Sequence, residues 1–175
     1  TVVFIGTTYA YTTMLSAMLC GIALGGGIGS WLITREGIRA ASANGLGAVL
    51  ALAGSACLLV MPLFAGIPGA LYAPGSGHAD WVEGSLLRFS FAFGAMLPAT
   101  VLFGMTFPFA VAAAVSGGAR LGRGVGWLYA ANTLGGVLGA AAGGFLLLPA
   151  LGTQNALLLL SSLLVVAGML LLLGT

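Results

Sequence analysis

Charged side chains are scarce in this sequence. Its 175 residues include five arginines, three carboxylates and no lysine, so charged residues make up 5% of the chain. Soluble globular domains carry about 25% charged residues, because water must wet their surfaces. Hydrophobic residues make up 60% of the chain, and the mean hydropathy is +1.16. This composition excludes an ordinary soluble domain and predicts an integral membrane protein.

The few charges divide the chain into uncharged segments at residues 1–34, 40–79, 89–119 and 124–175. Each is longer than the roughly 20 residues that a helix needs to cross the bilayer core. Each is continuously apolar rather than alternating, which excludes a transmembrane barrel. Turn residues at 149–155 divide the last segment in two. We therefore predict one all-α transmembrane domain over residues 1–175, a bundle of about five helices at residues 8–33, 46–67, 86–115, 126–148 and 156–173.

Prolines shape two of these predicted helices. The second helix is expected to stop at Pro68 and Gly69, before a turn-rich segment. The third contains Pro98 and Pro108, and proline removes a backbone donor inside a helix. We expect kinks at these two residues, or a break near Gly104.

The arginines predict an orientation, because loops kept in the cytoplasm are enriched in basic residues. With five spans, one side of the membrane receives Arg35, Arg39, Arg120 and Arg123. The opposite side receives His78, Asp80 and Glu83, with Arg88 at the start of the third helix. We expect a multi-pass protein of a bacterial inner membrane, with its C-terminus in the cytoplasm.

Glycines recur every four residues in the first and fourth predicted helices, and so line one face of each. They are Gly21, Gly25 and Gly29 in the first and Gly135, Gly139 and Gly143 in the fourth. Small residues let helix backbones approach closely in lipid. Packing within one subunit is the favoured interpretation, and docking of a partner subunit or sliding during transport is the alternative.

Residues that could carry chemistry are few. One loop holds His78, Asp80 and Glu83, which we interpret as a solvated polar loop rather than a metal site. The glycine run at residues 24–29 lacks the strand and the acidic residue of a nucleotide-binding loop. No catalytic residue, cofactor or metal is predicted, and the absence of a basic patch excludes nucleic acid. Candidate polar contacts inside the spans are Tyr9, Tyr11, Thr12, Asn132 and Thr133.

Four motifs in order resemble a known family. They are residues 6–15 (GTTYAYTTML), 21–25 (GIALG), 103–108 (FGMTFP) and 129–135 (YAANTLG), the last accompanied by Gly144-Phe145 and Leu148-Pro149. Together they resemble the membrane domain of bacterial membrane-bound spermidine synthase-like proteins, in which a major-facilitator-like domain is fused to a polyamine aminopropyltransferase. Residues 35–39 (REGIR) also resemble the end of the major-facilitator signature, although Thr34 replaces its aspartate and Ser30 its leading glycine.

The resemblance implies that the five spans correspond to helices two to six of a major-facilitator-like six-helix half. In that family a soluble catalytic domain follows on the cytoplasmic side, and none of its site residues is present here. The favoured hypothesis is a non-catalytic membrane domain that serves as anchor or packing component, with lipid and other membrane subunits or a second copy as partners. One alternative is half of a transporter for a small solute such as a polyamine. Another is the membrane part of an aminopropyltransferase whose soluble domain follows this chain.

Overall fold

The structure is a computed structural model that describes residues 8–36, 43–71, 81–116 and 121–174. Apart from Gly174 and a non-helical kink at Gly152, these residues are helical, and no strand occurs among them. The elements are α1 (Thr8–Glu36), α2 (Ala43–Leu71), α3 (Trp81–Ser116), α4 (Leu121–Ala142), the short π-helical segment η2 (Gly143–Leu147) and α5 (Leu148–Leu173). The prediction of an all-helical chain is confirmed over this part of the sequence.

Four helical segments of the described chain are long and apolar enough to cross a membrane. They are Met14–Arg35, Ala43–Pro62, Phe93–Val115 and Gly122–Leu173. The chain therefore has the length and composition of a multi-pass membrane protein.

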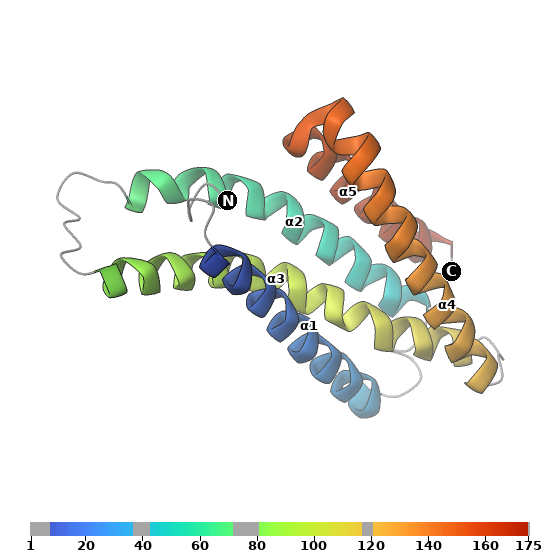
Figure 1. Cartoon of the computed structure of the whole chain (residues 1–175). Helices are drawn as coiled ribbons and strands as arrows, with labels where there is room; N and C mark the ends of the chain where they lie inside the picture. The colour runs from blue at the N-terminus through green and yellow to red at the C-terminus, as the bar shows by residue number, and fades with distance from the viewer. Residues whose placement is uncertain (1–7, 37–42, 72–80, 117–120, 175) are drawn as a thin grey trace.

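The helices pack in a row rather than around one centre. α1 packs against α3, α3 packs against α2, and α2 packs against α5. Figure 1 shows α2 and α3 running alongside each other, while α4 rises away from α3 after its first turns. Successive residues of α1 meet successive residues of α3, so these helices are parallel, whereas α2 and α5 meet in reverse order and are antiparallel.

Small side chains make up most of the buried core. The buried apolar residues of the described chain are Ala17, Val49, Ala53, Ala99, Phe109 and Ala156. Large side chains instead point outward, as Leu59 does with 66% of its surface exposed. This distribution is typical of helices in lipid, which associate by close backbone approach because lipid tails solvate large apolar side chains.

Two of the expected helix interruptions are wrong. α3 is continuous from Trp81 to Ser116, so it has no break near Gly104 and runs on through Pro98 and Pro108. α2 extends past Pro68 to Leu71. The proline ring fixes φ near −65°, which is a helical value, so a helix can continue through proline at the cost of one hydrogen bond. Packing of α3 against α1 on both sides of Gly104 offsets that cost.

The chain does break within the predicted turn at residues 149–155. Gly152 has φ 72° and ψ 167°, which is not a helical conformation, although the flanking residues remain helical. It is the one described residue with positive φ. At this point the chain reverses direction, and α5 returns to pack against α2 (Figure 1).

Candidate functional site

The glycine face of α1 lies directly against α3, and we call this contact the α1–α3 seam. A Cβ added to Gly29 would lie 2.9 Å from Cγ of Pro108, and one added to Gly25 would overlap the carbonyl oxygen of Val101. On the other side of the seam, a Cβ on Gly104 would lie 2.8 Å from Cα of Ile22. The two backbones are therefore in contact, and glycine alone fits at these positions.

A buried hydroxyl lies within this seam, and its hydrogen is donated inside its own helix. Gly21 faces Thr100, whose side chain is 8% exposed. The Thr100 hydroxyl lies 3.1 Å from the carbonyl oxygens of both Met96 and Leu97, to which it donates. A hydroxyl satisfied inside its own helix has no need of a ligand or a partner. Thr100 is therefore a packing residue rather than a binding residue.

A second seam joins α2 to α5, and it was not predicted from the sequence. A Cβ on Gly168 would lie 2.6 Å from the carbonyl oxygen of Gly47, and one on Gly54 would lie 2.8 Å from that of Ser161. Gly47, Ala51 and Gly54 recur at intervals of four and three residues, which is the spacing of one helix face. That spacing was the available signal, but glycine alone does not recur there every four residues.

The glycine face of α4 is open. A Cβ added to Gly135, Gly139 or Gly143 would meet no atom within 4 Å in the described chain. All residues from 129 to 141 are exposed. The reason is that α4 meets α3 only near its start, where the rings of Phe107 and Tyr129 lie 4.9 Å apart, edge to face at 67°. Within the described residues, none of the three predicted glycines is therefore packed against another helix.

The structure does not gather the candidate polar contacts into one site. Tyr11, 71% exposed, and Thr12 lie in the first turns of α1, which packs along α3 and not along α4. On α4, Asn132 is exposed and the Thr133 hydroxyl donates to the Tyr129 carbonyl oxygen, 2.9 Å away. Tyr9 falls in α1, and its side chain lies outside the described residues.

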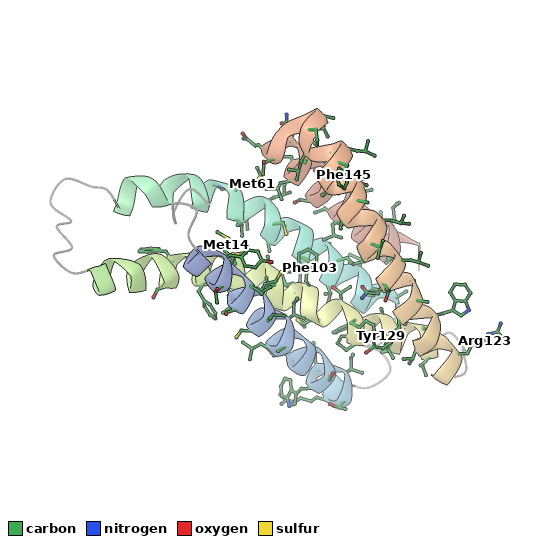
Figure 2. The ribbon with its side chains drawn as sticks, in the orientation of Figure 1. Met14, Met61, Phe103, Arg123, Tyr129 and Phe145 are labelled. Atoms are coloured by element: carbon green, nitrogen blue, oxygen red, sulfur yellow. The ribbon has the colours of Figure 1, made fainter. Side chains whose placement is uncertain are left out.

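Two of the four predicted boundary arginines are described. Arg35 lies near the end of α1, with its guanidinium carbon 5.1 Å from the centre of the Trp31 ring. Arg123 is exposed near the start of α4 (Figure 2), and Trp127, four residues further along the helix, is 69% exposed. Tryptophan and arginine at helix ends are typical of a membrane–water interface. Arg39 and Arg120 lie outside the described residues.

The described residues offer few side chains that could form a catalytic or metal centre. No group of three or more histidine, cysteine or acidic residues that could hold a metal ion occurs in the described part of the chain. His78 and Asp80, from the polar loop, lie outside the described residues, and the side chain of Glu83 is also not described.

Comparison with known proteins yields no relative. The chain matches no protein-family model, no curated protein and no solved structure. The resemblance to the spermidine synthase-like membrane domain therefore stays a prediction that rests on the four sequence motifs.

Proposed function

We propose that the chain crosses the membrane five times, with its C-terminus in the cytoplasm of a bacterium. The segment Gly122–Leu173 has 52 residues and would measure about 78 Å as one helix, whereas the bilayer core is about 30 Å thick. Gly152 divides this segment. The parallel pairing of α1 with α3 and the antiparallel pairing of α2 with α5 agree with five alternating crossings. Arg35 and Arg123 then lie on one side, as basic cytoplasmic residues do.

Reporter fusions test this topology. Alkaline phosphatase is active outside the cytoplasm and green fluorescent protein inside it, so each is fused after residues 38, 76, 119, 152 and 175. We expect fluorescence after residues 38, 119 and 175 and phosphatase activity after 76 and 152. Phosphatase activity after residue 175, with the other four fusions as expected, would show four crossings and contradict the proposal.

The proposed role is that of a non-catalytic membrane domain, an anchor or packing component of a larger membrane protein or complex. The observation that carries it is that small residues line both seams and bring the helix backbones into direct contact. The candidate polar residues are not gathered into a binding site. The proposed family is the membrane part of spermidine synthase-like proteins, and its support is the order and spacing of the four motifs.

The native mass of the protein tests this role. The protein is extracted from its own membranes in mild detergent and its intact mass is measured together with any co-purifying subunits. Partners in fixed ratio to a chain near 17.3 kDa would support an accessory subunit. A longer polypeptide with aminopropyltransferase activity would support the membrane part of an enzyme. A chain of this mass that is monomeric, without partner subunits, would contradict both.

The transporter alternative has weaker support. A polyamine is cationic, and a cation inside the membrane requires a carboxylate or a comparable partner. The four candidate spans contain no aspartate or glutamate. Tyr11 and Asn132, which would have to share a solute, belong to helices that do not pack along each other. The packing role therefore accounts for more of what the described helices show.

A further inference from the structure

In the described chain, α3 and α4 contact each other at Phe107 and Tyr129, but the glycines further along α4 contact no other helix. Phe107 and Tyr129 form an edge-to-face ring pair at the end where the two helices are joined. One turn further along α3, Phe103 is 44% exposed. Two turns further along α4, a Cβ added to Gly136 would meet no atom within 4 Å. Phe103 and Phe107 are four residues apart, so they lie on the same side of α3.

The open face of α4 is the same face that already contacts α3. Its members follow one another at intervals of three and four residues, which places them on a single side of a helix. They are Tyr129, Asn132, Gly136, Gly139 and Gly143. Because this face already contacts α3 through Tyr129, the helix indicated to cover the rest of it is α3. A helix from another chain would have to share that face with Phe107.

We propose that α4 is a hinged helix that closes on α3, with Phe103 seated on Gly136 between the two helices. Glycine suits this position because it leaves room for an aromatic ring close to the backbone. Closure completes the α3–α4 pair from the Phe107–Tyr129 contact onward. It gives Gly136, Gly139 and Gly143 a neighbour within the same chain.

The fold supplies a hinge for this motion. α5 is fixed to α2 through the contacts of Gly54 and Gly168. Between this fixed helix and α4 lies the π-helical segment Gly143–Leu147, in which no residue is buried. π-helical segments interrupt the regular hydrogen-bond ladder and often accompany functional bends. Closure moves the far end of α4 toward α3, so η2 and the residues up to the non-helical Gly152 must move with it, while α5 beyond Gly152 keeps its contacts with α2. A static anchor requires no moving helix, so closure goes beyond the proposed function and does not depend on it.

Disulfide trapping tests closure directly. A disulfide requires two Cβ atoms about 4 Å apart, and Phe103 is not within that distance of Gly136 in the open arrangement. The full-length chain in native membranes, with Cys20 and Cys57 replaced by serine, receives F103C and G136C. We expect an intramolecular crosslink on mild oxidation. The matched control, F103C with L138C, should lose it, because Leu138 lies on the opposite side of α4 and is 64% exposed.

A second pair keeps the proposed contact intact. M96C with G139C lies further along both helices and leaves Phe103 and Gly136 unchanged, and we expect it to crosslink as well. Absence of both intramolecular crosslinks, or equal trapping by the L138C control, would overturn closure. A crosslinked product of twice the chain mass would show that a second copy covers the face, and would also overturn it.

Discussion

Replacing Gly25 with leucine is expected to lower the free energy of unfolding by about 3 kcal/mol, the upper range for overpacking of a close-packed interface. A Cβ at this position would overlap the Val101 carbonyl oxygen and lie 3.0 Å from Cα of Gly104. These are backbone atoms, so no rotamer change relieves the clash. α1 must instead move away from α3, and the seam between them is lost. Unfolding in mixed micelles with increasing sodium dodecyl sulfate, followed by circular dichroism, measures the change.

Gly27 provides the matched control on the same helix. It is exposed, and a Cβ there would meet no atom within 4 Å. Gly27→Leu should leave stability unchanged or raise it by up to about 1 kcal/mol, because glycine is a poor helix former. Equal destabilisation by the two substitutions would mean that leucine disturbs α1 itself, and that the α1–α3 seam is not what Gly25 maintains.

The sequence predicted the helical elements well because charge is so rare in it. Arg35 marks the end of α1 and Arg123 the start of α4, since a charged group favours the polar edge of the membrane. The break at Gly152 was also foreseen in position. The interruptions expected at Pro68 and near Gly104 were not found, because both residues lie in helices that proline geometry and tertiary packing allow to continue.

Helix partners were harder to predict than helices. The regular spacing of Gly21, Gly25 and Gly29 indicated a packing face, and the structure places α3 against it. The identical spacing on α4 predicts the same, yet that face is open. A periodic pattern defines which side of a helix is smooth, but only the tertiary arrangement decides which helix reaches it. The α2–α5 seam was missed for the converse reason, since it mixes glycine with alanine and lacks a simple repeat.

Substitution of Gly152 by valine is expected to destabilise the protein by about 3 kcal/mol. The observed φ of 72° with ψ of 167° lies in a region that is essentially restricted to glycine. A β-branched side chain adds to that strain because its χ1 is already restricted. The same unfolding titration measures the loss, and Gly126→Val serves as the control. Gly126 lies in α4, is exposed and has no atom within 4 Å of an added Cβ.

The bilayer determines whether the backbone strain at residue 152 changes the stability of the protein or its topology. In water, a chain with valine at residue 152 would relieve it by straightening into one helix from Gly122 to Leu173. In a membrane that helix would be about 78 Å long, and α5 would lose its contacts with α2. The strain is therefore retained, and the loss appears as lower stability with topology unchanged. A C-terminal fluorescent fusion that stays fluorescent in Gly152→Val would agree with this. Unaltered stability would instead show that the reversal does not depend on glycine.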